Sequence, residues 1–255
     1  MNPATVAAIG AFLATTVPAT ADVSFGFLRG EAWLDLNVTA YGIAAQSGRI
    51  AGGYEPRYPG SFGVAAPVYW DDMRASPTLT TRYYPGTGGC CRAITPDGRF
   101  AVGRNGYDPV VQHVGPFMWD LSTRTAIPLA YGATWYRDSP YAVSADAGVV
   151  VGQDGGQAVI WAGGQRSVIV PSDPQTSTES AARAVSADGS RVAGYRGSAG
   201  DGSGRRFDAF VWSQATGAQT LPSSVPGATS TAAMGISASG ETIVGYCGER
   251  YGEQW

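Results

Sequence analysis

The residues able to do chemistry are few and lie far apart in the chain. His113 is the only histidine, and the surrounding VVQHVGP contains no nucleophile-elbow motif for a Ser-His-Asp site. Glycoside hydrolysis needs paired carboxylates, and the acids that loops could bring together are Glu55, Asp108, Asp138 and Asp201. One histidine and three cysteines without zinc-ligand spacing predict no metal. We therefore expect no catalytic residue and no cofactor, with a glycoside hydrolase or lyase as the alternative.

The cysteines raise a separate question because their number is odd. Cys90 and Cys91 are adjacent, and Cys247 lies near the end of the chain. In an oxidising compartment we expect one disulfide, either Cys247 with Cys90 or Cys91, or a strained vicinal Cys90–Cys91 bridge. Three unpaired cysteines are the alternative, because a Cα separation beyond roughly 7 Å forbids a bridge.

A repeated unit must position these residues. Five segments share one pattern: YGIAAQSGRIAGGYE, RAITPDGRFAVGRNG, YAVSADAGVVVGQDG, RAVSADGSRVAGYRG and MGISASGETIVGYCG. Each has one glycine at the same place: Gly52, Gly103, Gly152, Gly194 and Gly245. A tryptophan recurs in step: Trp70, Trp119, Trp161, Trp212 and Trp255. A period of about 40 to 50 residues without a helical pattern is typical of propeller blades.

Each repeat is expected to form four short strands, so the fold class is all-β and the architecture a five-bladed β-propeller. The repeats cover about 39–80, 90–130, 138–171, 181–222 and 232–255. Residues 23–28 (VSFGFL) are expected to complete the last blade and close the ring, which removes two open sheet edges. A right-handed β-solenoid and an open fragment of a larger protein are the alternatives.

Turn chemistry supports the strand assignment. Asp97 and Asp188 each precede a glycine, as hairpin turns with positive φ require. Equivalent positions hold Gln46, Asp146 and Ser239. These aspartates are therefore interpreted as structural, and the tryptophans as packing between blades. The five innermost strands (TAYGIA, CCRAIT, SPYAVS, AARAVS and AAMGIS) contain no acid, which disfavours a glycosidase.

Composition and the N-terminus bear on location. Charged residues make up 15% of the chain and the formal net charge is −3, so we expect no nucleic-acid partner. Residues 1–21 are interpreted as a signal peptide, because an apolar run too short to span a bilayer precedes Ala19-Thr20-Ala21. A buried N-terminal helix or strand is the alternative, since no basic residue precedes Arg29. Residues 22–255 would then form one secreted, periplasmic or cell-surface domain without a transmembrane segment.

The phrases AVSADGSRVAGY, DAFVW and AVIW resemble the bacterial extracellular HAF repeat, which joins a V-S-A-D-G-x-x-V-V-G segment to an A-F-x-W segment. The resemblance covers nearly the whole chain after residue 21. The first copy departs from it, because AAQSG replaces the S-A-D-G turn, and the last lacks a fourth strand. The resemblance implies a secreted or surface protein of unassigned function.

Aromatic residues gather in the long segments expected at one propeller face. Loops on a rigid scaffold are frequent binding sites, and exposed aromatics supply contact energy at low entropic cost. We therefore expect a monomeric binding module for carbohydrate or an extracellular protein. The alternative is that these rings pack the loops themselves. The candidate ligand-binding residues are Tyr54, Tyr58, Tyr83, Tyr84, Tyr107, Trp135 and Tyr136.

Overall fold

The computed structural model describes residues 36–56, 66–71, 78–79, 89–108, 113–132, 139–171, 179–198, 206–223, 225 and 228–248. Within these ranges the regular structure consists of strands, with no helix. The all-β fold class is therefore confirmed. The same ranges contain no helix with the length and hydropathy needed to cross a membrane.

The strands form five antiparallel sheets, here called blades I to V. Blade I contains β1 (Leu36–Ile43), β2 (Ile50–Pro56), β3 (Ala66–Trp70) and β4 (Thr78–Leu79). Blade II contains β5 (Cys90–Ile94), β6 (Phe100–Asp108), β7 (His113–Asp120) and β8 (Thr125–Pro128). Blade III contains β9 (Ser139–Val143), β10 (Val149–Asp154), β11 (Gln157–Ala162) and β12 (Gln165–Val170). Blade IV contains β13 (Ser180–Val185), β14 (Arg191–Ser198), β15 (Arg206–Ser213) and β16 (Gly217–Thr220). Blade V contains β17 (Ser230–Ile236) and β18 (Ile243–Gly248).

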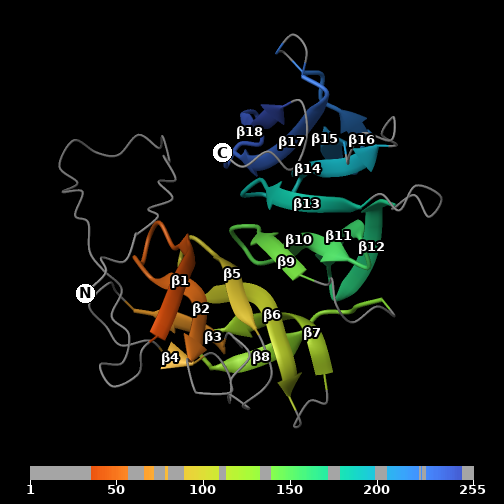
Figure 1. The fold of residues 1–255 in the computed structure, drawn as a ribbon. Helices are drawn as coiled ribbons and strands as arrows, with labels where there is room; N and C mark the ends of the chain where they lie inside the picture. Colours follow the sequence, from red (N-terminus) through yellow and green to blue (C-terminus); the bar gives the residue numbers. More distant parts are fainter. Residues whose placement is uncertain are drawn as a thin grey trace, which may run out of the picture.

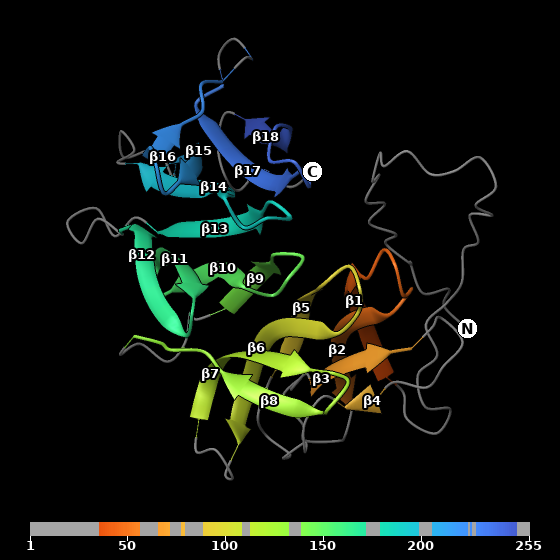
Figure 2. The same ribbon diagram turned by 180° about the vertical axis from the view of Figure 1, so that it is seen from behind.

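The blades follow one another around a common axis (Figures 1 and 2). The first strands of successive blades contact one another, and these inner strands are β1, β5, β9, β13 and β17. The described blades form an arc with blades I and V at its ends. Every described ladder joins antiparallel strands of a single repeat, so the β-solenoid alternative is wrong for these residues. Closure into a five-bladed ring by residues 23–28 stays a prediction, because that segment lies outside the described ranges.

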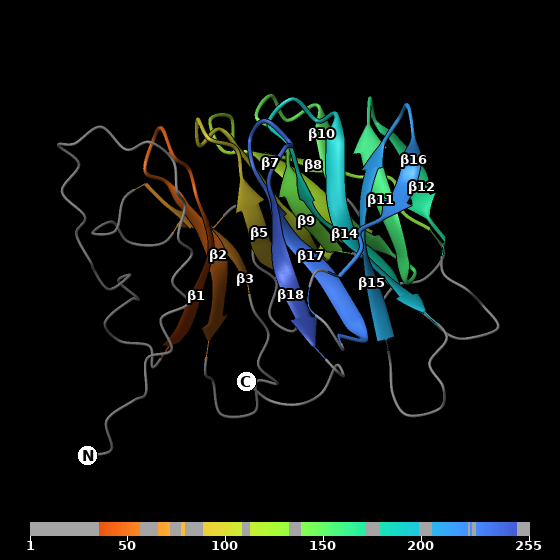
Figure 3. The same ribbon diagram turned by 90° about the horizontal axis from the view of Figure 1, so that it is seen from above.

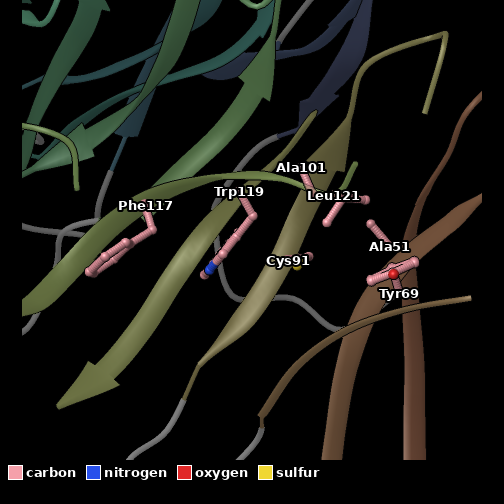
Figure 4. Packing of buried hydrophobic residues seen from close by; sticks show 7 residues of the cluster. All are labelled: Ala51, Tyr69, Cys91, Ala101, Phe117, Trp119 and Leu121. Carbon is pink, nitrogen blue, oxygen red and sulfur yellow. The ribbon is translucent and has the colours of Figure 1, made fainter. Parts of the chain in front are cut away.

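Side chains from neighbouring blades interlock to form the core. At the interface of blades I and II, Ala51 and Tyr69 pack against Ala101, Phe117 and Trp119 (Figure 4). At each interface between described neighbours, the residue before the repeated glycine of one blade packs with the residue two positions before the repeated glycine of the following blade. Trp119, Trp161 and Trp212 face the previous blade, so these three are interblade packing residues. At most 2% of the surface is exposed in Trp70, Trp119 and Trp161.

In blades II, III and IV the turn between the first two strands is held by an aspartate carboxylate. In blade IV, the Ser186 hydroxyl donates to Asp188 Oδ1 at 2.6 Å, and the Ser190 N–H donates to the same oxygen at 3.0 Å. The hydroxyl bond is the main cause that lowers the pKa of Asp188 to about 2. Because the carboxylate is used within the turn, its role is structural. Equivalent pairs are Thr95–Asp97 in blade II and Ser144–Asp146 in blade III.

Adjacent turns are also joined to each other. The Gln46 N–H donates to Pro96 O at 2.8 Å, and the Ala145 N–H donates to Ala187 O at 2.9 Å. The Ala187 N–H in turn donates to Ala238 O at 3.0 Å. Pro96 has no N–H and cannot continue this series from blade II to blade III. These bonds fix the spacing of neighbouring blades at the hairpin end.

The repeated glycine permits a close approach of the inner strand. A Cβ on Gly103 would lie 2.0 Å from Cys90 O, and one on Gly245 would lie 2.0 Å from Ala232 O. Such distances are impossible for any residue with a side chain. The glycines recur because the inner strand of every blade bulges opposite them.

Candidate functional site

The two ends of the blades differ in their connections (Figure 3). The hairpins that join the first two strands of each blade lie at one end, called the hairpin end. The opposite ends of the strands are called the loop end, and the connections from one blade to the next lie there. Residues 57–65, 109–112 and 199–205 connect second to third strands there, and residues 80–88, 133–138 and 172–178 connect one blade to the next.

Most aromatic candidates belong to these connections. Tyr58, Tyr83, Tyr84, Trp135 and Tyr136 lie outside the described residues, so their binding role stays a prediction.

Tyr54 and Tyr107 were expected between strands, but they belong to the loop-end parts of β2 and β6. Tyr54 is paired with Val38 and Ala66. The expectation was wrong in placement because both strands continue beyond the apolar run that marks them in the sequence, through Pro56 and Asp108.

The acidic candidates are only partly described. Glu55 and Asp108 lie in β2 and β6, and Asp138 and Asp201 lie outside the described residues. His113 begins β7 and is the cross-strand partner of Asp108. In the described part of the chain no three His, Cys, Asp or Glu residues are placed to hold a metal ion.

A buried carboxylate at the loop end of blade III was not predicted from the sequence. Asp154 ends β10 and has no exposed surface. It forms an ion pair with Arg166 of β12, and the Gly132 N–H donates to its Oδ2 at 2.8 Å. A buried charge needs such partners. The available signal was an acid that ends a buried apolar strand, VVVGQD, with an arginine two strands later.

Asp154 fixes the segment that leads into residues 133–138. Three contacts hold that segment: Leu129 N–H to Pro116 O (3.0 Å), Trp161 Nε1–H to Ala130 O (2.5 Å) and Gly132 N–H to Asp154. Residues 129–132 are therefore anchored to blades II and III immediately before the connection that carries Trp135 and Tyr136.

The three cysteines are free thiols in the structure. Cys90 and Cys91 begin β5 in blade II, and Cys247 lies in β18 of blade V. Cys91 is fully buried in the core between blades I and II, and this burial raises the pKa of its thiol. A bridge from Cys247 to Cys90 or Cys91 stays a prediction. Counting thiols in the denatured, unreduced protein tests it, since one thiol per chain supports a bridge and three exclude it.

No protein-family model matches the chain, and no curated protein matches it in sequence. Its structure is similar to that of TolB from Acinetobacter baumannii, with a TM-score of 0.50 and 17% identity. That match covers 84% of this chain and 55% of TolB, so the chain spans about half the length of that protein. A putative TolB from Agrobacterium tumefaciens gives a TM-score of 0.46 at 19% identity. This second match covers 67% of this chain and 61% of the putative TolB chain. The blade arrangement and the first likeness together support a β-propeller fold.

Proposed function

We propose that this protein is a secreted, periplasmic or cell-surface binding module that recognises a carbohydrate or an extracellular protein through its loop end, without catalysis. The anchoring of residues 129–132 carries the proposal. A loop loses less conformational entropy on binding a ligand when the residues that lead into it are already held in place. Residues 129–132 are such a lead-in segment, here called the root of the connection 133–138. Trp135 and Tyr136 follow such a root directly.

The buried ion pair supports a positioning role for the root. Removing one partner of such a pair usually costs about 3–5 kcal/mol, because the other charge stays buried. A pair of this kind keeps the backbone at Gly132 in one place. The expected signal peptide at residues 1–21 and the resemblance to HAF repeats support an extracellular setting.

The first experiment separates binding from turnover. The chain beginning at Asp22 is applied to a glycan array and used in a pull-down from extracellular proteins, beside a hydrolysis screen on plant and bacterial polysaccharides. We expect saturable binding without turnover. Hydrolysis of any polysaccharide would instead support the alternative, a glycoside hydrolase or lyase that uses loop carboxylates.

The second experiment locates the binding surface. We expect Trp135→Ala with Tyr136→Ala to abolish binding to the ligand found in the first experiment. If the two rings contact a ligand rather than the protein, their substitution should leave thermal unfolding unchanged, since exposed substitutions usually change stability by no more than about 0.5 kcal/mol. Tyr246→Ala is the matched control, because Tyr246 is a 39% exposed aromatic on blade V. Large destabilisation with binding retained would show that the two rings pack the loop instead.

A further inference from the structure

The inner strands carry one unpaired residue at the same place in every blade. In each ladder between the first two strands, the register shifts across a single residue of the inner strand. Bulges of this kind redirect a side chain and are frequent beside functional sites. The five bulge residues are Tyr41, Arg92, Tyr141, Arg183 and Met234.

Tyrosine and arginine alternate along the first four blades, and they pair across blade boundaries. Arg92 Cζ lies 4.7 Å from the ring centroid of Tyr41, and Arg183 Cζ lies 4.1 Å from that of Tyr141. A guanidinium over an aromatic face is held by a cation–π interaction, while its N–H groups stay available at its edge. Each tyrosine therefore orients the arginine of the following blade.

Neither of these two arginines has an acidic partner among the described residues. Arg49, Arg99 and Arg166 form ion pairs with aspartates. The Nε of Arg92 is buried and donates no hydrogen bond. A buried donor without an acceptor destabilises the folded protein.

The hydrogen-bonding groups and apolar side chains near Arg92 and Arg183 favour an anionic ligand with apolar parts. Arginine offers only donors. Among the five bulge residues the two tyrosine hydroxyls are the only oxygen acceptors, and none carries a carboxylate or an amide. Sugar hydroxyls need acceptors as well as donors, whereas a carboxylate needs donors alone. Exposed apolar side chains lie on the same inner strands, with Ile43 65% and Met234 39% exposed. This combination suits a peptide that carries both acidic and apolar residues.

We propose that the inner strands bind an acidic, partly apolar peptide, with one carboxylate on Arg92 and another on Arg183. Arginine and carboxylate form two parallel N–H···O bonds when the guanidinium is oriented in advance, as Tyr41 and Tyr141 orient it here. This site is distinct from the loop-end surface. It can therefore bind even if the proposed loop-end function fails.

The test uses a fluorescently labelled 12-residue peptide in which Glu and Leu alternate, with a Gln-and-Leu peptide as its uncharged match. Anisotropy should show binding of the Glu peptide that weakens as salt is added. We expect Arg92→Gln and Arg183→Gln each to weaken this binding about tenfold, because a charge-assisted pair is lost. Arg124→Gln is the control, since it removes the same charge from the exposed turn between β7 and β8.

A conservative variant separates binding from folding. Arg92→Lys keeps the charge and the apolar stem but loses the planar fork, so it should stay folded and bind more weakly than the unmodified protein. Equal binding of the Gln peptide would overturn the proposal, as would an equal loss in Arg124→Gln and Arg92→Gln. Binding of polygalacturonate without binding of the Glu peptide would also overturn it and assign the arginines to an anionic polysaccharide.

Discussion

The two ends of the arc present outer faces in opposite environments. On the outer face of blade I, Ile50, Val68 and Trp70 are only 0–3% exposed. On the outer face of blade V, Val244 is 60% and Tyr246 39% exposed. No described strand lies against either outer face in Figures 1 and 2. One end of the arc is therefore buried and the other is open.

This difference shows that a single blade has two apolar faces and cannot bury either of them alone. Inside the arc, Val151 faces blade IV and is fully buried, whereas Val244, at the same repeat position, has no described blade to face. The apolar pattern of a blade thus specifies two interfaces, and each needs a neighbour. Blade V keeps the pattern and exposes it, whereas the outer face of blade I is buried.

Of the changes that test the two ends of the arc, deleting residues 22–28 should have the largest effect on folding and association. If VSFGFL completes blade V, the deletion leaves the sheet edge of β18 open, and open edges promote association between chains. We expect loss of cooperative thermal unfolding, or oligomers in size-exclusion chromatography with light scattering. A deletion variant that stays monomeric with an unchanged Tm would show that this segment covers neither end of the arc.

The strands could be read from the sequence where turn chemistry marks both of their ends. In blade III, β10 lies between ADAG and Gly155-Gly156, and β11 lies between Gly155-Gly156 and Gly163-Gly164, so glycines mark the ends of both strands in the sequence. The first strand was harder to place, since its loop end carries no turn signal. β1 accordingly begins at Leu36, three residues before the expected start near Thr39.

The sites could be predicted less well than the strands, for a physical reason. A side-chain pair such as Arg92 over Tyr41 joins residues of different blades, and no local pattern indicates which residues meet. The bulge was also hidden. The sequence shows only the repeated glycine. The reason for this glycine is the close approach of the inner strand, which is seen only in the structure.

Trp70→Ala should cost nearly as much stability as Trp119→Ala, because both side chains have no exposed surface. Removing a buried aromatic side chain costs about 3–5 kcal/mol through lost burial and the cavity left behind. Urea denaturation of both variants gives the comparison. A loss below about 1 kcal/mol for Trp70→Ala alone would mean that the outer face of blade I is open, and the two ends of the arc would then be alike.

Acid should weaken the turn of blade IV, where Asp188 is the acceptor, whereas Ser239 stands at the equivalent position of blade V. The pKa of Asp188 is about 2 in the folded chain, below the value near 3.9 of an unfolded aspartate. Its contribution is therefore complete above about pH 4 and is lost as the pH falls towards 2. Hydrogen-exchange protection of the Ser190 amide should fall over that range. In Asp188→Asn the same amide should show no such change, and a pH-independent Ser190 amide in the unmodified protein would contradict the assignment.

Val244→Ser should have the smallest effect, and it tests the comparison most directly. Val244 is 60% exposed and Val151, its equivalent in blade III, is fully buried. Substitution of an exposed residue changes stability by about 0.5 kcal/mol or less, whereas Val151→Ser loses apolar burial worth about 1.5–3 kcal/mol and also buries a hydroxyl. Denaturation curves of the two variants should therefore differ clearly. If Val244→Ser were as costly as Val151→Ser, the outer face of blade V would have a partner in solution, and size-exclusion chromatography would distinguish a second copy from a segment of the same chain.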